Sequence, residues 1–539
     1  MKKKILRLIS LVMVCVLLCG CTALTDYWNA IAATFGYRTA EIVPYSDMTY
    51  TRPDMSQLTN TLSDACNAAA GTELEPIIHK IWAFYDAYDL FYTQYALADI
   101  RYSGDLTDPY WEAEYNYCSD NSPRVDAMLE ELYYALAKSP CLKELESSDY
   151  FGEGYFDSYQ GENNWNEEFT ALMEAESALI SRYYELSGQT SAYETGSEEF
   201  YEACFGEMAQ VLIDLILLRQ EIAAYWDYDS YNQFATDFYH YRDYSVEEAL
   251  DYLEQVRVQL VDIYREVNQS GIWEDGFNFS TESQTYAYVR EMSEKMGGTV
   301  AEAFTLMDQA GLYDIVYSEN KYPSSFEIYL TSYSEPFIFM SPGLTTYDHL
   351  TFAHEFGHFC NDYASYGSYA GVDVLEFFSQ GMEYLSLCYV ENTEHLTKMK
   401  MADSLCLYIE QSAFATFEML MYQIPAEELT AEALTELYDQ VAQAYGFESI
   451  GYDPREFVTI NHYYTNPLYI LSYVVSNDAA LQLYQLEQAS GGSGLAIFQE
   501  NLATGEYYLH SFLESAGLES PFAAGRLEDV RKTFEDILR

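Results

Sequence analysis

The residues best suited to chemistry in this chain lie together at 354–358, which read His-Glu-Phe-Gly-His. On an α-helix, His354 and His358 lie one turn apart and point in the same direction. Two imidazoles in that relation can bind one Zn²⁺ through their ring nitrogens. Glu355 would then lie beside the metal without binding it, where it can take a proton from a zinc-bound water. The spacing therefore predicts zinc-assisted hydrolysis. A helix surface with two solvated histidines is the simpler alternative.

A catalytic zinc site needs a third protein ligand and keeps its fourth position for water. The helical pattern over about 372–390 offers candidates, because it combines an apolar face with a polar stripe of Asp373, Glu376, Gln380 and Glu383. Burial of such a stripe is costly unless its members are paired or bind a metal. We take Glu376 as the third ligand and Glu383 as the partner that holds a ligand histidine. The alternative is that the stripe is the wet face of a surface helix.

The residues around the histidines also fit a buried helix. Ala353 and Gly357 are small, so a second element could approach the metal-binding face closely. Three phenylalanines between 352 and 359 form one apolar face. Asp348 lies just upstream and could cap the helix N-terminus.

A second set of candidates is His462, Tyr469 and Tyr473, spaced i, i+7 and i+11, close to one helical face unless Pro467 interrupts the helix. When hydroxide attacks a peptide carbonyl, negative charge develops on the oxygen, and a preorganised donor can stabilise it. A tyrosine hydroxyl or an imidazole N–H can be that donor. The alternative is that these residues are wall or core aromatics in a chain with 54 Tyr.

Taken together, these motifs resemble the oligoendopeptidase F and thimet oligopeptidase family of zinc metallopeptidases. The resemblance rests on the His-Glu-x-Gly-His helix, the strand-like 336–341 before it, the segment 373–383 after it and the segment 462–473. It covers about 200–539, and over 60–200 it extends only to helical character.

The resemblance implies a mostly α, two-lobed helical metallopeptidase with a deep central channel and a small β-sheet beside the zinc helix. It implies one Zn²⁺ per chain, and roles for His462, Tyr469 and Tyr473 in stabilising the transition state or binding substrate backbone. The implied activity is endopeptidase cleavage of short unstructured peptides, by a monomer. We expect an extended peptide to pair with the strand at 336–341, because Pro336 is compatible with an exposed edge.

The rest of the chain is dominated by amphipathic helical patterns. They lie at about 60–100, 123–138, 165–188, 197–225, 246–269, 281–297 and 399–422, with strand signals chiefly at 326–340. No linker rich in Pro, Gly or Ser divides the chain after about residue 60. We therefore expect one helical unit over 61–539, with the catalytic core at about 200–539.

The N-terminus has the pattern of a bacterial lipoprotein signal peptide over 1–21. Four basic residues within 1–7 precede a mostly apolar stretch at 8–18 that is too short to span a membrane stably. Leu18-Cys19-Gly20-Cys21 resembles a lipobox, with Cys21 as the lipidated residue. Secretion without lipid is the alternative. We expect a protein outside the cytoplasm, anchored to the bacterial cell membrane, with 22–60 as a spacer.

The net charge of −60 becomes −64 once the signal peptide, with four basic and no acidic residues, is removed. This charge excludes nucleic acid as a partner, because phosphate binding needs a basic surface. An acidic surface could steer cationic peptides inward, although solubility is the simpler explanation. The seven cysteines after Cys21 show no disulfide spacing, so we expect free thiols, with one or two disulfides as the alternative.

Two other functions compete with a peptide-cleaving enzyme. One is a peptide-binding lipoprotein without catalytic activity, and the other is a zinc metallopeptidase of another lineage that acts on folded proteins or the cell wall. The presence of Glu355 argues against the first, because binding alone does not need a general base.

Overall fold

The computed structural model describes residues 42–147, 151–161, 167–190, 193, 196–367 and 370–539. The predicted signal peptide, the predicted lipidation site Cys21 and the spacer up to residue 41 lie outside the described residues. Within the described part of the chain, no helix is long and apolar enough to cross a membrane. The seven cysteines of that part are all free thiols.

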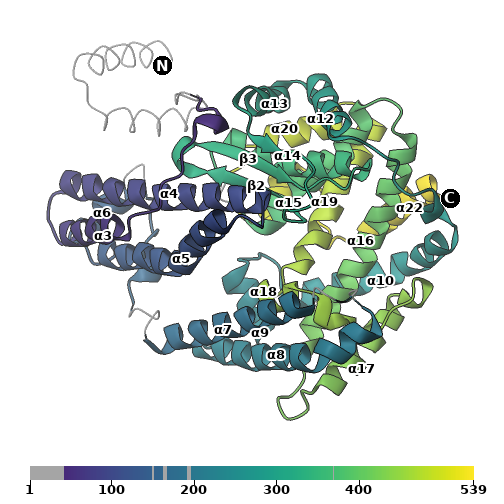
Figure 1. Ribbon diagram of the computed structural model, residues 1–539, viewed down its shortest axis with the longest axis horizontal. Helices are drawn as coiled ribbons and strands as arrows, with labels where there is room; N and C mark the ends of the chain where they lie inside the picture. The colour runs from purple at the N-terminus through teal and green to yellow at the C-terminus, as the bar shows by residue number, and fades with distance from the viewer. Residues whose placement is uncertain (1–41, 148–150, 162–166, 191–192, 194–195, 368–369) are drawn as a thin grey trace.

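The protein is mostly α-helical, as predicted (Figure 1). Four N-terminal helices pack around a small apolar core of their own: α3 (Met55–Ala69), α4 (Leu74–Gly104), α5 (Pro109–Leu136) and α6 (Leu142–Glu146). These helices project to the left in Figure 1. The C-terminal part of α4 packs against the sheet and joins the main core through Leu97 and Ile100.

The later helices share the main, larger core. They are α7 (Glu167–Thr190), α8 (Glu198–Tyr225), α9 (Tyr231–Phe234), α10 (Val246–Gln269), α11 (Ile272–Asp275), α12 (Glu282–Met296), α13 (Gly298–Ala310), α14 (Tyr347–Ser365), α15 (Val372–Tyr389), α16 (Glu394–Met421), α17 (Ala431–Ala444), α18 (His462–Thr465), α19 (Ile470–Ala489), α20 (Ser493–Asn501), α21 (Leu509–Ala516) and α22 (Arg526–Leu538). All seven predicted helical stretches are helical, with differences in extent. The stretch at 60–100 is two helices, because the chain turns at Ala70–Glu73. The stretch at 123–138 begins earlier, at Pro109, where the Asp108 carboxylate caps the helix.

Residues 45–60, which the sequence analysis assigned to the spacer, comprise a segment that packs onto the helices and the first turns of α3. Met48 is buried, and the Tyr50 hydroxyl donates to Glu114 at 2.7 Å. Arg52 forms an ion pair with the same carboxylate at 2.6 Å. In the structure, the folded part of the chain therefore begins before residue 61.

Three strands form a small sheet in the order β1–β3–β2: β1 (Tyr313–Asp314), β2 (Ser325–Leu330) and β3 (Glu335–Met340). β3 pairs in parallel with β1 and antiparallel with β2, where Ser325 lies opposite Met340. The strand predicted at 336–341 is therefore the central, fully buried strand, and the prediction that it offers an exposed edge is wrong. Pro336 is tolerated there because β1 pairs only with Ile338 and Phe339 and does not reach it.

The sheet, α14, α15 and α19 form successive layers in the core (Figure 1). α14 packs against β2 and β3, α15 packs against α14, and α19 packs against α15. These layers bring together side chains from 354–383 and 462–473.

Candidate functional site

Helix α14 carries the His-Glu-Phe-Gly-His motif in the interior of the protein. The predicted apolar face is fully buried, with Phe352, Phe356 and Phe359 at 0% exposure. The expectation that Asp348 caps this helix is wrong, because Thr346 is the N-cap residue. Asp348 lies in the first turn, and its carboxylate accepts hydrogen bonds from backbone N–H groups in the preceding loop. It therefore fixes the loop to the helix.

The polar stripe of α15 is buried along its whole length. Its four members, Asp373, Glu376, Gln380 and Glu383, are each 8% exposed or less. The wet face of a surface helix is thereby excluded for this stripe. Because buried carboxylates are costly without partners, the contacts of these side chains decide what the stripe does.

α14 and α15 approach each other closely at Gly357. A Cβ atom built on Gly357 would lie 2.4 Å from the Phe378 carbonyl oxygen and 2.7 Å from the Ser379 Cα. Both are backbone atoms, so they cannot move aside without shifting α15. The predicted close approach at a small residue is therefore present, and it sets the distance between the histidines and Glu376.

We expect Gly357→Ala to lower the free energy of unfolding by about 1–3 kcal/mol, the usual cost of overpacking a core. A matched control is Gly206→Ala in α8, where an added Cβ has nothing within 4 Å. That change should stabilise the protein slightly, because alanine is the better helix former. Chemical denaturation of both variants measures the difference, and equal effects would show that the helix contact at Gly357 is not tight.

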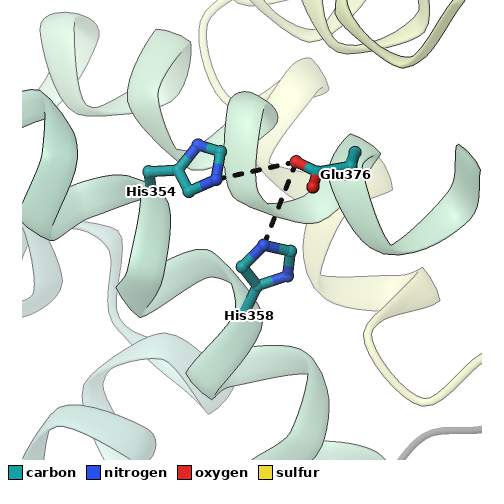
Figure 2. Close-up of side chains that lie close together, drawn as sticks. All are labelled: His354, His358 and Glu376. Carbon is teal, nitrogen blue, oxygen red and sulfur yellow. Dashed lines mark ion pairs between the residues drawn. The ribbon is translucent and has the colours of Figure 1, made fainter. Parts of the chain in front are cut away.

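Three potential metal ligands converge between α14 and α15 (Figure 2). One ligand atom each from His354, His358 and Glu376 lies within 4.8 Å of the others. The Glu376 Oε2 atom is 3.6 Å from His354 Nε2 and 4.0 Å from His358 Nε2. Tetrahedral ligands at about 2.1 Å from zinc are about 3.4 Å apart, so these donors fit such an ion with small adjustments.

The orientation of His354 is fixed from behind by Glu383. His354 Nδ1 lies 2.8 Å from Glu383 Oε1, so Nε2 points toward Glu376. Lys400 in α16 pairs with the other oxygen, Glu383 Oε2, at 2.6 Å. Lys400 is only 2% exposed, so a buried ammonium, carboxylate and imidazole form one chain. Such outer partners are typical of metal-binding histidines.

Charge and burial shift the pKa values of these groups in different directions. Burial alone would lower the pKa of His354, but the hydrogen bond and charge of Glu383 raise it to about 9. Burial lowers the pKa of His358 to about 4 and raises the pKa of Glu355 to about 7. Burial also opposes ionisation of Glu383, but the charge of Lys400 and the bond to His354 hold its pKa below the usual range.

The predicted donors of the C-terminal segment lie together, and one of them contacts Glu376. Pro467 does interrupt the helix, since α18 ends at Thr465 and α19 begins at Ile470. Even so, the ring centroid of Tyr469 lies 5.8 Å from the ring centroid of His462 and 5.2 Å from that of Tyr473. The Tyr469 hydroxyl donates to Glu376 Oε1 at 3.1 Å. The Tyr473 hydroxyl lies 3.5 Å from His462 Nε2, and burial lowers the pKa of His462.

Sequence reasoning missed two polar residues of the site. Ser379 donates to Glu376 Oε2 at 3.0 Å, and Lys400 holds Glu383. Lys400 had a signal in the sequence, because it lies between Met399 and Met401 within a predicted amphipathic stretch. A lysine at such a position needs a buried acidic partner, but its identity cannot be read from the chain.

Comparison with known proteins bears on this geometry. Residues 45–177 match the model of a protein family described as the Peptidase M3 N-terminal domain. Residues 45–177 are similar to this domain, and the chain has the fold of solved oligoendopeptidase F structures. A solved structure described as an oligoendopeptidase F aligns with a TM-score of 0.77 at 20% identity, over 92% of this chain and 98% of that one. One described as an oligoendopeptidase F from Bacillus anthracis str. Ames aligns at 0.73, with 20% identity and coverage of 93% and 98%.

A structure of PZ peptidase A with an inhibitor aligns with a TM-score of 0.78, at 18% identity, over 92% of this chain and 98% of that one. No curated protein matches the sequence. The resemblance predicted from the sequence is confirmed, and the findings support a peptidase. The family match falls on 45–177, mostly within 60–200, where the sequence resemblance extended only to helical character, and it begins in the stretch assigned to the spacer.

Proposed function

We propose that this peptidase is a zinc-dependent endopeptidase that hydrolyses short unstructured peptides outside the cytoplasm. One observation carries the proposal: two imidazole nitrogens and one carboxylate converge from α14 and α15. Two His and one Glu form a common ligand set of catalytic zinc and leave a position open for water. The rival of a peptidase from another lineage receives no support from the fold.

The other residues of the site have complementary roles in this proposal. A bound zinc ion would supply Lewis acidity toward water and the scissile carbonyl. Glu355 takes one proton from the water whose oxygen attacks the carbonyl carbon. As the C–N bond breaks, Glu355 returns that proton to the leaving amine nitrogen. His462, Tyr469 and Tyr473 provide N–H and O–H donors for the negative charge on the carbonyl oxygen.

The position of the substrate follows from the corrected sheet order. β2 is an outer strand of the described sheet, so its free edge replaces β3 as the surface on which an extended peptide pairs. Burial raises the pKa of Glu355, and the backbone N–H of Glu327 in β2 lies close enough to its carboxylate to offset a small part of that rise. A peptide on this edge would therefore lie close to the base.

Limited access to the histidines favours slim substrates. The His354 and His358 side chains are 25% and 19% exposed, and Glu376 is 8% exposed. An extended chain can reach such a site, whereas the surface of a folded protein cannot. The proposed channel between two lobes would likewise admit an extended peptide and exclude a folded protein.

We expect cleavage of unstructured peptides up to about a few tens of residues, at about 3.3 Å of reach per residue. Stable folded proteins should be spared. The test is incubation of zinc-loaded mature protein with a mixed peptide library, a length series of one unstructured sequence and a stable globular protein, read by mass spectrometry. Equal rates on short, long and folded substrates would contradict the restricted site, and no cleavage of any peptide would contradict the function.

The Lys400–Glu383 pair should support metal binding. We expect Lys400→Met to weaken zinc affinity by about ten- to a hundred-fold, as is usual when an outer partner of a ligand is lost. The physical reason is that Glu383 loses the cation that compensates its charge and orients it on His354. Chelator competition measures the affinity. Lys398→Met, at an exposed position of the same helix, is the matched control and should bind zinc normally.

Membrane attachment through lipid on Cys21 is part of the proposal. It is supported by the basic residues, the apolar stretch and the lipobox-like sequence at the N-terminus. A monomer suffices for the proposed function, because all named site residues come from one chain.

A further inference from the structure

Buried side chains from distant elements bind the backbone of residues 462–473, here called the His462 segment. Arg219 in α8 is fully buried and donates to the carbonyl oxygens of Tyr463 and Tyr464 at 2.5 Å each. His240 lies 2.8 Å from the Pro467 carbonyl oxygen through Nε2. The segment is therefore held by side chains more than 200 positions away in the sequence.

Two further contacts of this kind enclose Leu468. Its backbone N–H donates to Glu418 Oε1 at 2.8 Å, and its carbonyl oxygen accepts from Arg242 Nη2 at 2.9 Å. The same Nη2 donates to the Ser472 hydroxyl, in the first turn of α19, at 2.8 Å. Glu418 is 0% exposed and Arg242 is 8% exposed. Both backbone polar groups of Leu468 are thus bound by buried charged side chains.

Leu468 has an uncommon backbone conformation. Its φ is +62°, in the left-handed region that a side chain with a Cβ rarely adopts. Such a residue persists only where surrounding contacts determine its conformation, and these residues cluster at functional sites. The next residue is Tyr469, whose hydroxyl reaches Glu376. The direction in which Tyr469 points therefore depends on the conformation of Leu468.

Arg242 also contacts the helix that carries Glu376. Its Nε lies 3.5 Å from Asp373 Oδ2 in α15, and Asp373 is three residues before Glu376. Tyr244 donates to the same oxygen at 2.8 Å. One guanidinium thus touches both the segment of Tyr469 and the helix of its acceptor, which fixes the distance between them.

We propose that Glu418 and Arg242 are positioning residues that hold Leu468 in its left-handed conformation and thereby aim the Tyr469 hydroxyl at Glu376. The catalytic consequence rests on the proposed peptidase function. Neither residue contacts the reacting atoms. They affect turnover only through Tyr469, so replacing them should have no further effect once Tyr469 itself is replaced. A residue needed only for stability would not show that dependence.

The experiment is a double-mutant cycle between Glu418 and Tyr469. Glu418→Leu removes the acceptor and should lower kcat by about ten- to a hundred-fold, the range expected for a misplaced catalytic group, with little change in KM. In a Tyr469→Phe background the same change should cause no further loss. Glu418→Gln keeps an acceptor oxygen and should retain most of the turnover. Equal losses from Glu418→Leu in both backgrounds would overturn the proposal.

A second variant covers the case in which Glu418→Leu fails to fold. Arg242→Lys keeps the charge but loses the planar fork that reaches two acceptors, and it should show the same dependence on Tyr469. If the wild-type protein cleaves no peptide, the proposed function is wrong, but the positioning role is still open to test. Crystal structures of the two variants then decide, and an unmoved Tyr469–Glu376 contact would overturn the role.

Discussion

Glu355→Gln should lower peptide hydrolysis by about a hundred- to ten-thousand-fold, the usual contribution of a general base. Zinc content should stay near wild type, because Glu355 is not one of the three converging ligands. Glutamine keeps the size and shape of the side chain, so the packing of α14 against the sheet should also persist. The loss should appear in kcat and in kcat/KM alike, because the base acts only as the transition state forms.

Steady-state kinetics and metal analysis of one preparation measure both quantities. Glu410→Gln in α16 is the matched control, since it makes the same chemical change where the carboxylate accepts from Tyr264 at 3.1 Å. That variant should cleave peptides at the wild-type rate. Full activity of Glu355→Gln would require a different mechanism, and loss of zinc in Glu355→Gln would mean that the carboxylate is needed for the metal.

The parts of the site that the sequence predicts are those set by helical periodicity. His354 and His358 share a face because they lie one turn apart, and the α15 stripe repeats at helical spacing. The choice of Glu376 and Glu383 within that stripe needed only the chemistry of zinc ligands and their partners. The structure places Glu376 toward both histidines and Glu383 behind His354.

The parts that could not be predicted depend on pairing between distant segments. The order of the strands cannot be read from 326–340, because β1 is only two residues long and lies outside that stretch. The contact of Tyr469 with Glu376 joins residues 93 positions apart, and the helix that was to present Tyr469 is interrupted. Nothing in the sequence indicated that Leu468 would have a left-handed backbone, because leucine rarely adopts that conformation.

Buried cations have an unusual place in this acidic chain. Only 26 of its residues are Lys or Arg, against 86 Asp and Glu. Even so, Lys400, Arg219 and Arg242 are each 8% exposed or less, and each binds an element of the site or the His462 segment. A buried cation needs paired partners, so an arrangement of the site that separated any of these three side chains from its partners would be strongly disfavoured.

Glu376→Gln should abolish most zinc binding while the protein stays folded. The amide oxygen can accept from one of the Ser379 and Tyr469 hydroxyls and the amide NH2 can donate to the other, but the amide lacks the negative charge of the ligand. Loss of a direct ligand should weaken zinc affinity by at least about a hundred-fold, the upper range for an outer partner. At a free zinc concentration of 100 times the wild-type Kd, zinc stabilises the wild type by about 2.7 kcal/mol, and it should stabilise the variant by less than about 0.5 kcal/mol.

Thermal unfolding with and without zinc measures this difference, and the metal-free proteins serve as their own control. Metal-free Glu376→Gln and metal-free wild type should unfold at similar temperatures, because the amide replaces the carboxylate atom for atom. Peptide hydrolysis should disappear together with zinc binding. Undiminished zinc stabilisation of the variant would assign the third ligand elsewhere on α15, and Glu383 would be tested next, since it is the other carboxylate of the stripe that contacts His354.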